Sequence, residues 1–195
     1  MINIVLFGPP GSGKGTQSQN LVQKFNLKQI STGDLFRYNI KNETELGKLA
    51  KSYIDKGALV PDQVTIDMLT AELQKPTETN GFIFDGFPRT YAQAEVLDQI
   101  AKANTGAETT VCLSLIVEDS ILLERLLERG KTSGRSDDAD EKIIASRIKE
   151  YYDKTAEVAE FYKKQNKYVE LNGVGDIQDI TKALSTEIEK FTVKA

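Results

Sequence analysis

The sequence predicts an α/β fold: a doubly wound, parallel, five-stranded sheet with helices on both faces. Two observations predict it. Short apolar runs alternate along the chain with longer segments of helical periodicity. Three of the apolar runs are also nearly continuous in hydrophobicity, which is typical of parallel strands that are covered on both faces. None of these runs approaches the ~20 apolar residues that are needed to span a bilayer.

The expected elements follow in order along the chain. The strands are expected at residues 3–7, 27–31, 82–85, 110–117 and 168–171. The first helices are expected at residues 14–25, from Asp62 onward after Pro61, and at 90–102. A further helix is expected to stop at Gly130, and one long helix should cover residues 139–164. The last helix should carry an apolar stripe from Ile177 to Phe191. Acidic residues at 138, 140 and 141 suit the positive end of the long helix. Two segments interrupt the alternation: residues 31–60, which are helical without strands, and the polar residues 130–140.

Composition narrows the class of protein. The 195 residues fit one domain, with 39% apolar and 28% charged residues, and the net charge of −4 gives no support to a nucleic-acid role. One cysteine and no histidine exclude a disulfide framework and a Cys/His zinc site. The N-terminus enters a strand without a basic region, so no signal peptide is expected, and the reducing cytosol is the expected compartment.

The stretch GPPGSGKGT, from Gly8 to Thr16, lies between the first strand and the first helix. Glycines let successive backbone N–H groups point into one concavity, the helix N-terminus adds positive charge, and Lys14 adds a cation. This predicts a phosphate-binding loop and a P-loop type of fold. Gly15 stands where the general pattern has a Ser or Thr that holds Mg²⁺. The metal is then held by Thr16, or mainly by waters and phosphate oxygens.

Arginine is used sparingly. Of the 25 basic residues six are arginines: Arg37, Arg89, Arg125, Arg129, Arg135 and Arg147. Taken singly, each is better explained as a solvated or salt-bridged surface residue, with Glu124 and Glu128 as partners for the helical pair Arg125 and Arg129. Taken together, they exceed what one triphosphate requires, because guanidinium groups suit bidentate phosphate contacts. The set therefore predicts two phosphorylated substrates.

Asp85 ends the third strand, directly before the turn DGFPR. A carboxylate at this position commonly serves Mg²⁺, directly or through water, in P-loop enzymes. The alternative is an aspartate that only caps the turn before Gly86. Pro88 in the same turn could carry a cis peptide bond, which the sequence does not decide.

The blocks GPPGSGKGTQ, STGDLFR, GALVPDQV, GFIFDGFPRTYAQAE, RLLERGKTSGRSDD and RIKEYY resemble the adenylate kinase family, in order and spacing, over essentially the whole chain. Gly15 and Thr16 are themselves part of this family's pattern. The resemblance implies transfer of a phosphoryl group from ATP to AMP to give two ADP. It also implies Mg²⁺ with ATP, no nucleic-acid or membrane partner, and a monomer.

The resemblance also implies a role for individual residues. ATP would be bound by Gly11, Ser12, Gly13, Lys14, Gly15, Thr16, Arg125, Arg129 and Gly175. AMP would be bound by Thr32, Arg37, Ala58, Leu59, Val60, Gly86, Phe87, Pro88, Arg89, Gln93, Arg135 and Arg147. The catalytic cations would be Lys14, Arg89, Arg129, Arg135 and Arg147, and the metal would be served by Asp85 through water and by Thr16.

The single kinase domain would consist of a core and two mobile segments. The core would be residues 1–30, 61–127 and 139–195. Residues 31–60 would bind AMP and residues 128–138 would form a short lid, with Gly130 and Gly134 as its flexible points. The short lid lacks the insert that carries zinc in some members of the family.

Three questions stay open at this level. One extra residue separates Arg135 from Arg147; if it lies within the helix, Arg147 is turned by ~100° away from the site. A kinase for UMP or CMP is the nearest alternative, and Thr32 with Gln93 favours AMP because the amide can pair with the adenine edge. A nucleotide-binding regulatory protein is the second alternative, but it would not need a second phosphate pocket around Arg37 and Arg89.

Overall fold

A computed structural model describes residues 1–138 and 140–192 and confirms the predicted α/β architecture. The strands are β1 Ile2–Phe7, β2 Leu27–Ser31, β3 Gly81–Asp85, β4 Val111–Ile116 and β5 Tyr168–Asn172. They form one sheet in the order β2-β3-β1-β4-β5, and every neighbouring pair is parallel. The register pairs Leu6 with Asp85 on one side and with Leu113 on the other, which brings the carboxyl ends of the central strands to one edge.

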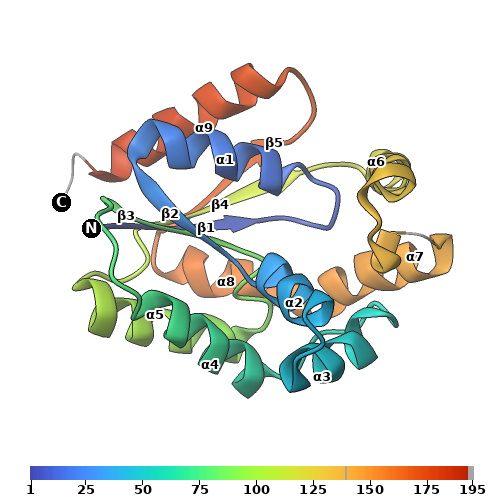
Figure 1. Cartoon of the computed structure of the whole chain (residues 1–195). Helices are drawn as coiled ribbons and strands as arrows, with labels where there is room; N and C mark the ends of the chain where they lie inside the picture. The colour runs from blue at the N-terminus through green and yellow to red at the C-terminus, as the bar shows by residue number, and fades with distance from the viewer. Residues whose placement is uncertain (139, 193–195) are drawn as a thin grey trace.

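The α-helices connect the strands and cover both faces of the sheet (Figure 1). They are α1 Lys14–Phe25, α2 Thr32–Lys41, α3 Glu45–Ile54, α4 Asp62–Leu73, α5 Tyr91–Thr105, α6 Asp119–Ser133, α7 Glu141–Glu150, α8 Glu157–Lys164 and α9 Ile177–Thr192. A 3₁₀ turn η1 spans Ser136–Asp138 and a π-helical turn η2 spans Tyr151–Thr155. Within the described residues, no helix is both long and apolar enough to cross a membrane.

The continuous apolar run of β1 is explained by two separate cores. Ile4 and Leu6 pack with Leu21 of α1 and with α9 on one face of the sheet. Val5 and Phe7 point to the other face, where they pack with residues of α4, α5 and α8. Successive strand side chains alternate between faces, so both halves of the run are buried. Cys112 in β4 is buried as well, and burial raises the pKa of its thiol well above the usual value.

The predicted helical segment 31–60 forms a small unit beside the sheet (Figure 1). Ser31 caps α2 by accepting a hydrogen bond from the backbone N–H of Asp34, and Thr44 caps α3 in the same way. Phe36, Ala50 and Val60 form its separate apolar core together with residues from the start of α4. This unit therefore has packing of its own, apart from the two cores of the sheet.

Two of the predicted helices differ from the structure. The sixth helix does not stop at Gly130: it runs on to Ser133 and ends at Gly134, which has the left-handed φ of 64°. A Cβ at position 130 would lie 2.3 Å from the carbonyl oxygen of Asp138, so glycine is needed there for the close approach of η1. Gly130 thus lies inside α6, and its role as a flexible point stays a prediction.

The predicted long helix over residues 139–164 is interrupted. Position 139 lies outside the described residues, and α7 begins at Glu141 with Asp140 as its cap, accepting a hydrogen bond from the N–H of Lys142. The helix then widens into the π-turn η2 before α8. Asp138 does not belong to the first turn of this helix, as the sequence suggested, because it ends η1 and pairs with arginines.

Candidate active site

A cavity of about 680 Å³ opens at the carboxyl ends of the strands. Its wall comes from the loop before α1, the start of α2, residues 57–60, the turn after β3, α6, the segment before α7, α7 itself, and the loop after β5. In open parallel sheets, ligands bind at this edge. Every residue that the sequence assigned to ATP, AMP or the metal lines this one cavity, including all six arginines.

The glycine-rich loop has the backbone expected of a phosphate site. Gly8, Gly11 and Gly13 all have positive φ, and at Gly8 a Cβ would lie 2.7 Å from the carbonyl oxygen of Leu115. Gly13 precedes α1 in a left-handed conformation and provides no side-chain cap. The first backbone N–H groups of α1 are therefore free to bind an anion, with the helix dipole in support.

Lys14 and Arg89 are half-buried cations with neutral partners. The Nζ of Lys14 donates to the carbonyl oxygens of Gly8 at 2.7 Å and Pro9 at 2.8 Å. The Nε of Arg89 donates to the carbonyl oxygen of Gly86 at 2.8 Å. Among the residues that the structure describes, neither cation forms an ion pair with a carboxylate.

Their electrostatic state points to an anionic ligand. Burial lowers the pKa of Lys14 to about 8, with neighbouring arginines adding to the effect and Asp85 opposing it. Burial also lowers the pKa of Arg89, and Arg147 adds to this effect. Buried charge is costly without a counter-charge, so an anion between these two groups would be strongly stabilised.

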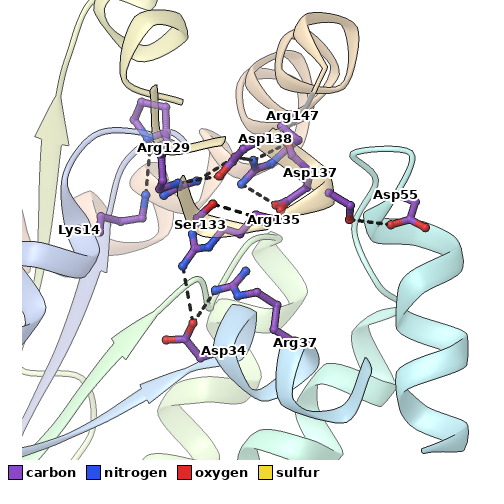
Figure 2. A network of polar contacts seen from close by, with 12 residues as sticks. Lys14, Asp34, Arg37, Asp55, Arg129, Ser133, Arg135, Asp137, Asp138 and Arg147 are labelled. Carbon is purple, nitrogen blue, oxygen red and sulfur yellow. Dashed lines mark hydrogen bonds and ion pairs between the residues drawn. The ribbon is translucent and has the colours of Figure 1, made fainter. Parts of the chain in front are cut away.

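Arg129 of α6 and Arg147 of α7 meet at one aspartate, Asp138 (Figure 2). Asp138 accepts two hydrogen bonds from Arg129, at 2.6 and 2.9 Å, and another from Arg147. Burial works to raise the pKa of Asp138, but the two arginines hold it below its usual value. Arg147 also pairs with Asp137 at 3.1 Å. The carboxylates of Asp137 and Asp138 thus provide the negative charge that balances these arginines in the free protein.

The predicted partners of the helical arginines are wrong. Arg129 pairs with Asp138, whereas Glu128 pairs with Lys131. Arg125 donates to the carbonyl oxygens of Gly173, at 3.2 and 3.3 Å, and of Gly11, at 3.4 Å. Glu124 and Glu128 each directly precede an arginine, and adjacent residues on a helix do not face each other. Glu128 is also three residues after Arg125, but it pairs with Lys131. Arg125 thus links the glycine-rich loop to the loop after β5.

A second aspartate links the two segments that were predicted to move. Asp34 pairs with Arg37 at 2.6 Å and lies 3.9 Å from Arg135, as Figure 2 shows. Burial works to raise the pKa of Asp34, but the hydrogen bond and charge of Arg37 hold it below the usual value. Close by, Ser136 donates to the carboxylate of Asp55 at 2.9 Å.

The turn after β3 and the start of α2 form the opposite end of the cavity. The hydroxyl of Thr32 donates to the carbonyl oxygen of Gly86 at 2.9 Å, and the peptide bond between Phe87 and Pro88 is cis. Gln93 is 2% exposed, and its side-chain oxygen accepts from the backbone N–H of Arg89 at 2.7 Å. Thr32 and Gln93 therefore lie at the same end, with Ala58–Val60 on the adjoining wall.

The orientation of Arg147, which the sequence left open, is toward the cavity. The α7 helix is regular from Glu141 through Arg147, so an extra residue has not rotated this side chain away. Position 139, the place between η1 and α7 where an extra residue can be accommodated, lies outside the described residues.

The donors near the glycine-rich loop are suited to Mg²⁺. Asp85 supplies a carboxylate and Thr16 a hydroxyl on the cavity wall, and oxygen ligands are what Mg²⁺ prefers. Within residues 1–138 and 140–192, no group of three or more acidic, histidine or cysteine side chains could hold a metal alone.

Sequence reasoning missed the aspartates that hold the arginines in place. Asp34, Asp137 and Asp138 all lie within three residues of an arginine that lines the cavity, and this interleaving is the signal that could have identified them. It also missed Asp62, which contacts Gln93. No local pattern indicates that contact, because the two residues are 31 positions apart.

Comparisons with known proteins agree with this geometry. The model of the family described as Adenylate kinase matches residues 6–167. A protein named Adenylate kinase from Flavobacterium psychrophilum is 58% identical over 98% of this chain and all of its own length. Proteins of the same name from Flavobacterium johnsoniae and Bacteroides thetaiotaomicron are 52% and 46% identical, again over 98% of this chain and their whole length. On this similarity, and with the glycine-rich loop and six arginines around one cavity, the chain belongs to the adenylate kinase family.

Proposed function

We propose that the cavity is divided into two nucleotide sites, in an enzyme that catalyses ATP + AMP ⇌ 2 ADP. The observation that supports this division is the pair of half-buried cations, Lys14 after β1 and Arg89 after β3, which both line the cavity without a carboxylate partner among the described residues. One phosphate chain needs one such cation. Two of them, on separate loops of one cavity, suit two anionic substrates and a phosphoryl group that passes between them.

ATP is assigned to the glycine-rich end. Gly11–Thr16 would bind its phosphates through backbone N–H groups and Lys14, and Arg129 would contact the phosphates from α6. Arg125, held by Gly173 and Gly11, would stack on the adenine, and Gly175 would contact the base through its backbone. Asp85, through water, and Thr16 would hold Mg²⁺. When bound, this ion neutralises part of the phosphate charge.

AMP is assigned to the other end. Arg37 and Arg89 would bind its phosphate, and Thr32 with Gln93 would contact the base. The rest of that wall consists of Ala58, Leu59, Val60, Gly86, Phe87 and Pro88. Arg135 and Arg147 also line the cavity, and would contact both nucleotides.

Phosphoryl transfer requires mainly that the substrates are positioned and that the charge on the transferring group is stabilised. An oxygen of the AMP phosphate attacks the terminal phosphorus of ATP, the bond to the bridging oxygen breaks, and ADP leaves as an anion. No covalent nucleophile is required, and the attacking oxygen is already anionic. Lys14, Arg89, Arg129, Arg135 and Arg147 would stabilise the charge that spreads over the transferring group. When phosphates arrive, the arginines would exchange the carboxylates of Asp137 and Asp138 for phosphate oxygens.

Residues 31–60 and 128–138 are proposed to close over the substrates. The first segment has its own small apolar core, and the second contains the left-handed Gly134, where α6 ends before η1. Ser136 with Asp55, and Arg135 with Asp34, are contacts that form between the two segments when they approach. Closure would exclude water and so prevent hydrolysis of ATP. A monomer in the cytosol remains a prediction.

ATP binding is expected to take up a proton near pH 8. The free protein holds the pKa of Lys14 at about 8, and a bound phosphate anion raises it. About half of the lysine is therefore neutral at pH 8 before binding and charged afterwards, and ATP affinity should fall as the pH rises through this value. Calorimetric titration with ATP alone at pH 8, in two buffers of different ionisation enthalpy, measures the uptake. Equal apparent enthalpies in both buffers would contradict the prediction.

The acceptor assignment is tested by a panel of monophosphates. With ATP as donor, kcat/KM for AMP should exceed that for UMP or CMP by about 10²-fold or more, because a single-ring base fills less of the site and does not reach Thr32 and Gln93 as a purine would. A coupled assay of ADP formation measures each acceptor. Comparable values for all three would favour a kinase for pyrimidine monophosphates, and binding of ATP without turnover of any acceptor would favour a regulatory role.

A further inference from the structure

Asp62, the first residue of α4, makes two contacts with the start of α5 that the sites assigned above do not use. Its carboxylate accepts a hydrogen bond from the Nε2 of Gln93 at 2.8 Å and from the hydroxyl of Thr90 at 3.0 Å. Thr90 in turn caps α5 by accepting from the backbone N–H of Gln93. Asp62 therefore holds both the side chain of Gln93 and the residue that begins its helix.

These contacts allow only one orientation of the Gln93 amide. A carboxylate accepts hydrogen bonds and donates none, so the amide nitrogen must face Asp62. A backbone N–H only donates, so the amide oxygen must face Arg89. Turning the amide by 180° would place like groups together at both contacts. Because Gln93 is 2% exposed, water could not relieve that mismatch.

The fixed amide retains one N–H hydrogen and one oxygen lone pair for a ligand in the cavity. Adenine offers an amino donor beside a ring-nitrogen acceptor. Guanine and hypoxanthine have a carbonyl acceptor where adenine has the amino group, so they need the opposite arrangement. A glutamine that is free to turn can match either base, whereas a fixed glutamine can match only one.

We propose that Asp62 is a positioning residue that sets the base specificity of the acceptor site. By fixing the Gln93 amide it lets the site accept a 6-amino purine monophosphate and reject the 6-oxo purines. This inference rests on the proposed assignment of AMP to this end of the cavity. Asp62 acts only through Gln93, so it should affect base selectivity and acceptor binding and leave phosphoryl transfer largely unchanged.

The test compares AMP with IMP as acceptors for Asp62→Asn. The neutral amide can donate or accept, so one of the two restraints on Gln93 is lost. The ratio of kcat/KM for AMP to that for IMP should fall about tenfold, the worth of one charge-assisted hydrogen bond. The fall should come mainly from KM, with kcat for AMP within about threefold of wild type. Asp62→Glu, which keeps a carboxylate, should retain more of the selectivity than Asp62→Asn.

Asp67→Asn is the matched control, because Asp67 is an exposed residue of the same helix that bonds only to Gln63 among the described residues. Its selectivity ratio should equal that of wild type. Thermal unfolding checks each variant, and Asp62→Ser makes the same test if Asp62→Asn does not fold. An unchanged ratio in a folded variant, or an equal loss for both acceptors, overturns the inference. Failure of the wild type to use AMP instead refutes the proposed function, which separates the two.

Discussion

Replacing Arg147 with alanine is expected to lower kcat by about 10³-fold or more while the protein stays folded. Arg147 lies on the wall of the cavity in which both nucleotide sites are proposed, with only 16% of its side chain exposed. A guanidinium at this position would stabilise charge on the transferring phosphoryl group, and alanine cannot replace it. Steady-state kinetics with ATP and AMP measure the loss, and thermal unfolding measures stability.

Lys149→Ala is the control for this substitution. Lys149 is on the same helix, is 75% exposed and pairs only with Asp153 among the described residues, so its removal should leave kcat close to that of wild type. A bisubstrate analogue that joins two adenosines through five phosphates should also bind the Arg147→Ala variant more weakly than wild type. Turnover of Arg147→Ala within threefold of wild type would show that the guanidinium takes no part in the transfer.

Replacing Lys14 with methionine is expected to have opposite effects on activity and stability. Turnover should fall by about 10³-fold or more, because the cation nearest the donor phosphates is lost. The free energy of unfolding of the nucleotide-free protein should stay equal or rise, because a partly desolvated charge bonded to carbonyl oxygens is replaced by an apolar chain of similar length. Initial rates and urea denaturation measure the two quantities.

Lys24→Met tests whether any lysine of α1 has such an effect. Lys24 is at the far end of α1, is 47% exposed and pairs with Glu189, so its loss should change neither turnover nor stability by much. If Lys14→Met were strongly destabilised, Lys14 would be holding the loop together as a structural residue. If it kept its turnover, the proposed ATP site would be wrong.

The sequence was most informative where a short segment determines its own structure. The apolar run of β1 and the glycines before Lys14 specify strand, loop and helix locally, and α1 occupies the predicted residues. The helix ends were harder, since Gly130 reads as a stop but is glycine because Asp138 approaches it closely. That contact belongs to the tertiary structure.

In the candidate site, too, the sequence indicates local features but not the contacts made by tertiary packing. Its arginines stand out because they are few, and their positions at strand ends and on one helix face bring them to one cavity. Their carboxylate partners could not be derived in this way. Asp138 pairs with both Arg129 and Arg147 because η1 lies between α6 and α7 in the chain and contacts both helices. The pairing of Asp62 with Gln93 likewise depends on how α4 and α5 pack.

The burial of Cys112 has a practical consequence for following movement in this protein. It is the single cysteine of the sequence and lies fully covered in the central sheet. Thiol-reactive dyes therefore have no accessible native target in the folded chain. Cysteines introduced at the exposed Ser52 of α3 and Ser133 of α6 would carry a fluorophore pair, and energy transfer between the dyes would report the distance between the two segments with the native thiol left in place.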